Sequence, residues 1–156
     1  MSEQIRTSLK QAMIAFHIHA HPEKVLKGIS VEIALKKVGE NTHTIWDLIH
    51  HLTFWQDLTL DAIDDKEVDW SRSKTENWPS TEKKIDQGVL DGTIQRFLEG
   101  VGEFSKRAET VDLDSNMPAW PQGTKIWALQ MIAQHNSYHL GQIVTLRQLL
   151  NSWPKE

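Results

Sequence analysis

Apolar residues recur at intervals of three and four along four long segments of the chain, which is the spacing of an amphipathic helix. These segments are residues 2–16, 43–64, 81–110 and 124–153. A shorter repeat at residues 31–38 follows Ser30 and predicts a short capped helix. No segment alternates between apolar and polar residues as a half-buried strand does. The pattern therefore predicts an all-α protein, and a length of 156 residues suits one helical domain over residues 1–156.

Helix boundaries are marked by capping and breaking residues. Thr42 or Thr44 can cap the second long helix, and Pro79 with Ser80 precedes the third. Gly123 and Pro154 bound the fourth, and a rigid turn is expected at residues 118–121. The connection over residues 65–80 is longer than most interhelical turns. A connection of that length can cross the end of a bundle, which allows the second and third helices to run parallel.

Composition removes several classes of function. The net charge is −4 and no cluster of Lys and Arg interleaves with aromatic residues, which argues against a nucleic-acid partner. No apolar run approaches the roughly 20 residues that cross a bilayer, so no membrane partner is expected. The first twenty residues lack the features of a secretory signal, which favours the cytoplasm. The absence of cysteine excludes disulfides, thiolate metal ligands and a cysteine nucleophile.

Three histidines form the strongest candidate site. His135 and His139 are four apart on the fourth helix, which places their Cβ atoms roughly 5–6 Å apart on one face and suits two ligands of one metal. On the second helix, His51 lies on the flank of the apolar stripe, whereas His50 projects toward solvent. Residues 116–153 contain no Asp or Glu, so a site centred there uses neutral imidazoles or a carboxylate from elsewhere.

Two helices that face each other along their apolar stripes would bring His51 to the other pair. Three neutral imidazoles leave coordination positions open, as in catalytic rather than structural zinc sites. Spacing alone leaves the alternative of hydrogen-bonded core histidines open. Asn136 stands where the zincin motif H-E-x-x-H has its general base, so a zincin is excluded.

The remaining histidines carry weaker signals. His17, His19 and His21 precede Pro22, and this segment is expected to be a loop with solvated imidazoles. His21 is kept as a lesser candidate because a loop after the first helix can fold over the bundle.

The chain contains seven tryptophans, an unusual number for its length. Three of them, Trp46, Trp55 and Trp127, are expected to pack within the bundle. Three others, Trp70, Trp78 and Trp120, fall in loops, where lining a pocket mouth, forming a dimer contact and packing at an edge remain alternatives.

Two runs of residues resemble a known family. Residues 44–55 (TIWDLIHHLTFW) resemble the second-helix motif of the DinB/YfiT-like metalloproteins, and residues 135–143 (HNSYHLGQI) resemble their fourth-helix motif H-x-x-Y-H-x-G-Q-I. Residues 21–37 are similar to the segment after the first helix. The resemblance implies a four-helix bundle with up-down-down-up topology. It also implies a three-histidine site, usually attributed to zinc or nickel and open to a cleft, with His51, His135 and His139 as ligands.

Members of this family share a fold more than an activity. Some are S-transferases that use low-molecular-weight bacterial thiols, and others are isomerases or proposed hydrolases. We therefore expect a metal-dependent enzyme acting on a small molecule, with a thiol transferase and a hydrolase as alternatives. The rival is a non-catalytic metal-binding or scaffold bundle, with a homodimer as one form of it, because spacing places no carboxylate as a general base. Tyr138 and Gln142 neighbour the expected ligands, either supporting them or simply packing.

Overall fold

Four long helices form the body of the protein in the computed structural model, which describes residues 3–80 and 84–154. They are α1 (Glu3–Met13), α4 (Ile45–Ile63), α5 (Gln87–Thr110) and α6 (Lys125–Leu149). The shorter elements are α2 (Pro22–Leu26), α3 (Val31–Leu35), a 3-10 helix η1 (Trp70–Lys74) and two strands, β1 (Asn116–Met117) and β2 (Trp120–Thr124). The prediction of an all-α protein is confirmed.

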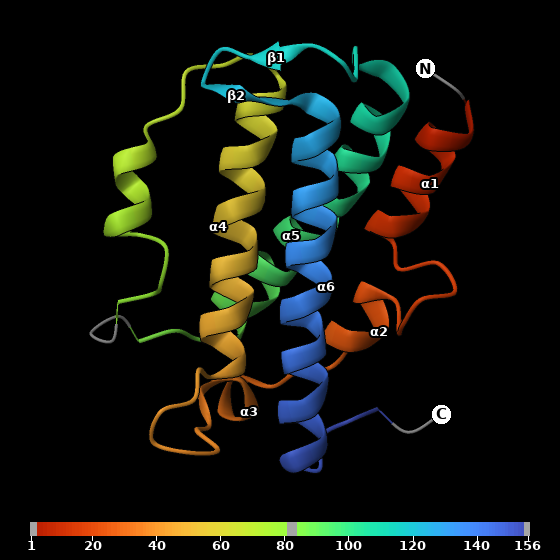
Figure 1. The fold of residues 1–156 in the computed structure, drawn as a ribbon. Coiled ribbons are helices and arrows are strands. Elements are labelled where there is room, and N and C mark those ends of the chain that lie inside the picture. The colour runs from red at the N-terminus through yellow and green to blue at the C-terminus, as the bar shows by residue number, and fades with distance from the viewer. Residues whose placement is uncertain (1–2, 81–83, 155–156) are drawn as a thin grey trace.

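The long helices pack in a ring, in which α4 contacts α5 and α6 while α1 contacts the same two helices from the other side. In Figure 1, α4 and α5 run in one direction along the bundle and α1 and α6 run in the other. Among the described residues, no helix combines the length and apolar character needed to cross a membrane.

Apolar side chains from every long helix meet at the centre of the bundle. Almost completely buried examples are Ile49, Leu52, Phe97, Phe104, Ile132 and Ile143. Burial of one such side chain stabilises the fold by roughly 1.5–3 kcal/mol. This packing holds α4 against α6 and so determines which of their flanking residues face each other.

The start of α4 is held by a capping box. The Asp47 backbone N–H donates to Thr44 Oγ1 at 3.1 Å, and the Thr44 N–H donates to the Asp47 carboxylate at 2.8 Å. Two of the otherwise unpaired N–H groups of the first turn are thereby satisfied. Thr44 is therefore the cap, and Thr42 instead bonds Gly39 in the preceding loop.

Two helices are shorter than their periodicity predicts. The first ends at Met13, not at residue 16, because Ala15 adopts a positive φ of 57° that an α-helix does not contain. The last ends at Leu149, not at residue 153, and Asn151 likewise has a φ of 53°. The apolar pattern continues past the last helix because Leu150 and Trp153 pack against the core, whereas Ile14 and Phe16 beyond the first helix are exposed.

The third helix begins later than expected. Its predicted start at residue 81 lies outside the described residues, but Lys84 to Asp86 are not helical. The helix begins at Gln87, where the Asp86 side chain accepts a hydrogen bond from the Val89 N–H at 2.9 Å. The true cap is therefore Asp86, and not the Pro79–Ser80 pair.

A short antiparallel hairpin, β1 and β2, replaces part of the loop before α6. Pro118 and Ala119 form its turn, whereas Trp120 and Pro121 belong to the second strand, so the expected turn over residues 118–121 is only half correct. Trp70 donates its indole N–H to the Ala119 carbonyl at 2.8 Å. The Trp120 ring packs edge-on against Trp70 and also against Trp127 on α6, at centroid distances of 5.1 and 4.6 Å. These indoles hold the 3-10 helix and the hairpin together.

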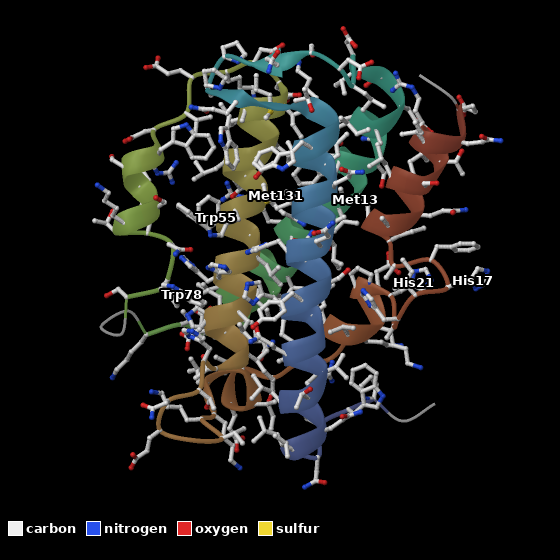
Figure 2. The ribbon with its side chains drawn as sticks, in the orientation of Figure 1. Met13, His17, His21, Trp55, Trp78 and Met131 are labelled. Carbon is white, nitrogen blue, oxygen red and sulfur yellow. The ribbon has the colours of Figure 1, made fainter. Side chains whose placement is uncertain are left out.

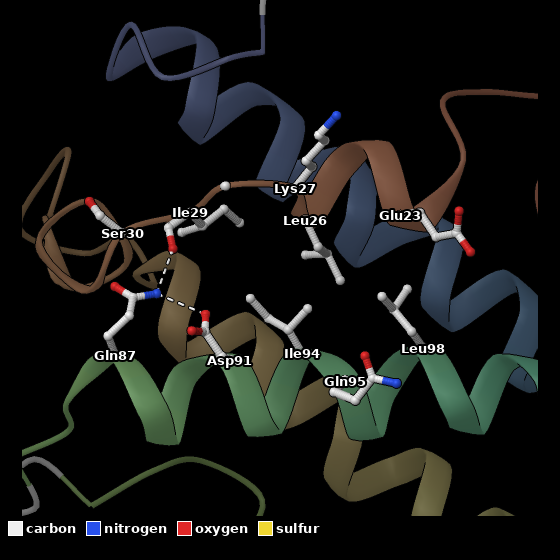
Figure 3. A pocket seen from close by; sticks show the side chains of 11 residues that line it. Glu23, Leu26, Lys27, Ile29, Ser30, Gln87, Asp91, Ile94, Gln95 and Leu98 are labelled. Carbon is white, nitrogen blue, oxygen red and sulfur yellow. Dashed lines mark hydrogen bonds between the residues drawn. The ribbon is translucent and has the colours of Figure 1, made fainter.

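The connection between α2 and α3 is anchored on α5 by one side chain, Gln87. Its amide donates to the Ile29 carbonyl at 3.1 Å and to Asp91 at 2.8 Å (Figure 3). Its oxygen accepts from the Val31 N–H at 2.9 Å. The groove beside it has an apolar floor formed by residues such as Leu26 and Ile94. All the hydrogen-bonding groups of Gln87 are used within the fold. The groove therefore lies where the connection between α2 and α3 packs on α5, and Gln87 offers no group to a ligand there.

The capping box generates a test of stability. Replacement Thr44→Ala is expected to lower the free energy of unfolding by about 1 kcal/mol, within a range of about 0.5–2 kcal/mol, because the N–H of Asp47 loses its acceptor. Urea denaturation of the purified protein measures the change. Thr42→Ala is the matched control and should cost less, since its hydroxyl bonds only within an exposed loop. Equal losses in the two variants would contradict this assignment.

Candidate metal centre

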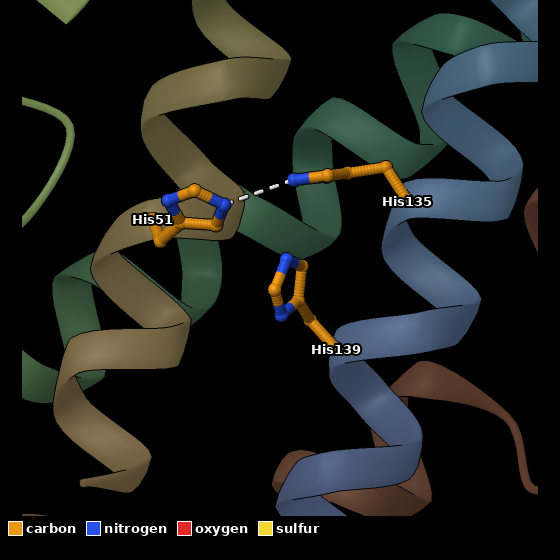
Figure 4. Close-up of side chains that lie close together, drawn as sticks. All are labelled: His51, His135 and His139. Carbon is orange, nitrogen blue, oxygen red and sulfur yellow. Dashed lines mark hydrogen bonds between the residues drawn. The ribbon is translucent and has the colours of Figure 1, made fainter. Parts of the chain in front are cut away.

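The three predicted histidines converge between α4 and α6 (Figure 4). His51 extends from α4, and His135 and His139 extend from successive turns of α6. One ring nitrogen of each lies within 4.8 Å of the other two. His50 points elsewhere, and its Nε2 lies 2.8 Å from the Glu76 carbonyl oxygen. The structure thus separates the adjacent pair on α4 as the helical projection predicts.

The separation of the nitrogens suits a shared cation. His51 Nε2 and His135 Nε2 are 3.0 Å apart. Two nitrogens that are each about 2.0–2.1 Å from one metal are separated by roughly 2.9–3.4 Å, so the observed distance is that of two neighbouring ligands. The cluster found in the described residues contains no carboxylate. Uncharged imidazole ligands are suited to divalent ions such as zinc and nickel.

Hydrogen bonds behind two of the rings determine which nitrogen is available. His51 Nδ1 lies 3.3 Å from the Asn77 carbonyl oxygen, and His139 Nδ1 lies 2.6 Å from the Gln142 side-chain oxygen. A carbonyl oxygen can only accept, so Nδ1 carries the proton in both rings and donates it. The Nε2 lone pair of each ring is therefore free to bind a metal, as in many histidine metal sites.

The third ring is supported differently. His135 Nδ1 is buried and has no hydrogen-bond partner among the residues that the structure describes. The side-chain amide of Asn136, next along the helix, is also buried and equally unpaired. Buried polar atoms in native proteins usually have a partner, often an ordered water. Because His51 Nε2 carries no proton, the 3.0 Å contact makes His135 Nε2 the donor in the metal-free protein, and no acceptor in the described residues faces His135 Nδ1.

Burial keeps the cluster uncharged. Desolvation, together with the neighbouring imidazoles, lowers the pKa of His51 and of His135 to about 4. Burial also lowers the pKa of His139 below its ordinary value. Because a metal binds only the neutral imidazole, these rings need not lose a proton at neutral pH before binding one.

An aromatic wall covers one side of His51. The Trp78 indole stacks on the His51 ring with a centroid distance of 4.1 Å and an interplanar angle of 12°. It stacks in the same way on His43, at 3.9 Å and 3°. Trp55 donates its indole N–H to the Asn77 side chain at 2.8 Å and so holds the residue whose carbonyl orients His51. Trp55 and Trp78 lie along α4 on the side of the connection over residues 65–80, here called the crossover segment (Figure 2).

Asn77 was not identified from the sequence, because its contribution is a backbone carbonyl. Any residue type supplies that group, so no side-chain pattern marks it. Its position follows from the path of the crossover segment, which ends where Trp78 covers His51. Only the neighbouring tryptophan, conspicuous in a polar loop, pointed to this part of the chain.

The histidines after α1 do not join the cluster. His17 and His21 are exposed and lie toward α1, away from α4 (Figure 2). The secondary expectation that His21 reaches the site is therefore not met in the described structure. His19 differs from a solvated loop residue, because its Nε2 lies 3.0 Å from the Ser137 hydroxyl on α6. This contact fastens the loop to α6 between the two turns that carry His135 and His139.

Gln142 and Tyr138 have different relations to the cluster. Gln142 bonds His139 directly and also lies 3.5 Å from the Tyr138 hydroxyl, at the long limit of a hydrogen bond. The Tyr138 ring meets His139 edge-on at 4.9 Å, but the residue is 65 % exposed. Gln142 therefore orients a ring of the cluster, whereas Tyr138 places a hydroxyl at its solvent side.

The lowered pKa values predict how the metal-free protein responds to acid. The unfolded chain takes up protons near pH 6.5, whereas His51 and His135 stay neutral in the folded state down to about pH 4. Their contribution to the free energy of unfolding should therefore be full above pH 6.5 and be lost progressively as the pH falls toward 4. Denaturation of chelator-treated protein across this range measures it. The double variant His51→Gln/His135→Gln should depend less on pH, and an identical dependence would refute the assignment.

Removal of the acceptor behind His139 should weaken metal binding. Gln142→Leu is expected to lower the affinity for zinc about 10- to 100-fold, because the ring loses the bond that orients it. Gln142→Glu retains an acceptor and should bind at least as well as the original protein. Competition with a chromophoric chelator measures both affinities, and Gln148→Leu on the exposed face of α6 is the matched control. A Gln142→Leu variant with unchanged affinity would show that the bond is dispensable.

Comparison with known proteins agrees with this geometry. The family model for the DinB superfamily matches residues 19–143, which include all three clustered histidines. No curated protein and no solved structure matches the chain. The family match covers well over half of the sequence and extends from the loop before α2 into the second half of α6. The chain therefore belongs to the DinB superfamily.

Proposed function

We propose that this protein binds one divalent metal ion, zinc or nickel, through His51, His135 and His139 and is a metal-dependent enzyme acting on a small molecule. The observation that carries the proposal is the cluster itself, in which three neutral imidazoles lie within ligand distance of one another. Two of them already have their Nδ1–H groups engaged. A site with three protein ligands leaves room for a further ligand, as catalytic zinc sites do.

A bound ion of this kind supplies Lewis-acid chemistry, which lowers the pKa of a coordinated water or thiol toward neutrality. The protein's own residues prepare the site for that role. Asn77 and Gln142 hold two rings in the tautomer that presents Nε2. Trp78 shields one face of His51 from water. The exposed hydroxyl of Tyr138, beside His139, can donate a hydrogen bond to a small molecule that enters from solvent.

Two reaction types fit this arrangement, a thiol S-transferase and a hydrolase. A thiol is a soft ligand that zinc and nickel accept readily, and a chain without cysteine requires an external, low-molecular-weight thiol for such chemistry. A hydrolase would require only water. Neither type requires a carboxylate base in the cluster, which contains none in the described part of the chain.

Metal content tests the first half of the proposal. Protein purified without a histidine tag should carry close to one equivalent of metal by mass spectrometry of the acid-released ion. His135→Ala should reduce this to near zero, because two imidazoles seldom retain a divalent ion through purification. His50→Ala is the matched control and should keep its metal, since that ring lies outside the cluster. Full metal content in His135→Ala would remove the proposed ligand set.

Turnover tests the second half. The zinc and nickel forms would each be assayed with a low-molecular-weight thiol plus an electrophile, and separately with ester and amide substrates. Activity above that of the metal-free protein, lost in His135→Ala, is the expected result and identifies the reaction type. Stoichiometric metal without turnover in either assay would favour a non-catalytic metal-binding bundle.

A further inference from the structure

A second cavity lies beside the histidine cluster, between α4, the segment after η1 and α5. Its volume is about 600 Å³, which is within the range of small-molecule sites. It is lined by residues from all three elements, among them His50, Thr53 and Thr93. None of the three clustered histidines lines it, so the cavity is distinct from the candidate metal centre.

The two sites share one wall. Trp78 stacks on His51 and also lines the cavity. Trp46 and Phe54 from α4 line it as well, and both are largely buried. The open apolar surface for an occupant comes from Val89 on α5, which is 48 % exposed, and ligand pockets are typically lined by such surface.

The charged groups of the cavity are arranged as two ion pairs. Arg72 binds Glu76 through Nε and Nη2 at distances from 2.7 to 3.1 Å, and its guanidinium lies 5.8 Å from the Phe54 ring centroid. Arg96 binds Asp57 through the same two nitrogens, at 3.2 and 2.8 Å. Burial raises the pKa of Asp57 despite the neighbouring Arg96, whose own side chain is 66 % exposed.

Each pair leaves donors unused. Both carboxylates are engaged by a guanidinium, whereas Nη1 of Arg72 and of Arg96 has no bond in the described structure. Lys84 also lines the cavity and has no ion-pair partner in the described ranges. Because a guanidinium has five N–H donors and a carboxylate accepts only some of them, the surplus in the cavity is of donors and of positive charge.

From these observations we propose that the cavity binds a small organic anion with a flat apolar body, such as an aryl carboxylate. The body would lie against Ile85 and Val89, beside the aromatic wall, and the carboxylate would receive hydrogen bonds from Arg72 and Arg96. The existing ion pairs hold both guanidinium groups in place, so little side-chain entropy is lost on binding. This site does not depend on the proposed metal chemistry, because none of its charged groups is a cluster histidine.

Calorimetric titration with 2-naphthoate tests the proposal, with 2-naphthamide as a neutral probe of the same shape. We expect naphthoate to bind at least tenfold more tightly than naphthamide, in metal-loaded and in metal-free protein alike. The variant Arg72→Gln/Arg96→Gln should lose at least tenfold in naphthoate affinity, as expected when charged hydrogen bonds are removed. Lys106→Gln, which removes another ion-paired cation from α5 outside the cavity, is the control and should bind normally.

The outcomes separate this proposal from the metal site. Circular dichroism and metal content of the double arginine variant should match those of the original protein, which shows that the fold and the histidine cluster are intact. Equal binding of the two probes, undiminished binding by the arginine variant, or no naphthoate binding at millimolar concentration would overturn the proposal. Naphthoate binding that disappears in metal-free protein or in His135→Ala would place the anion at the metal and would overturn it too.

Discussion

The close approach of three uncharged imidazoles between α4 and α6 is the constraint on which the rest of the site depends. Their ring nitrogens lie within 4.8 Å of one another, so two charged rings would repel each other. Burial makes protonation costly, and the pKa values of His51 and His135 fall to about 4. The packing of the apolar side chains that hold α4 against α6 offsets the free-energy cost of burying these rings. The cluster is thus maintained by packing, at the expense of its own electrostatics, until a cation binds.

The orientation of the rings has a separate origin from their proximity. Helix packing brings the Cβ atoms together, but the choice of nitrogen depends on oxygen atoms behind the rings. For His139 that oxygen comes from its own helix, through Gln142. For His51 it comes from the backbone of Asn77, in the segment that crosses from α4 to α5. The candidate centre is therefore built jointly by the bundle and by an irregular connection held in place by Trp55 and Trp78.

Sequence reasoning succeeded where periodic patterns control the structure. The helical period predicts the long helices. It also fixes the angular position of each histidine around its helix, which favours His51 over His50 and places His135 and His139 on one face. Periodic patterns did not predict the helix ends, because local backbone conformation and capping hydrogen bonds determine where a helix begins and ends. The positive φ of Ala15 and the cap at Asp86 end or begin helices within a continuing apolar pattern. Strand β1, only two residues long, is too short to show alternation.

The charged residues that line the second cavity could not be predicted from the sequence either. Arg72 and Glu76 lie four apart, which is the spacing of an ordinary surface pair, and no sequence pattern links Arg96 to them. Their common cavity depends on how the crossover segment folds back along α4 toward α5. Spacing within a helix cannot report on contacts between elements far apart in the chain.

The orientation of His51 depends on the backbone carbonyl of Asn77. Because that oxygen reaches His51 from outside the bundle, an insertion or deletion between η1 and Asn77 would leave all three histidines in place yet rotate one imidazole. The length of this connection therefore controls the orientation of His51 without any change in the histidines themselves.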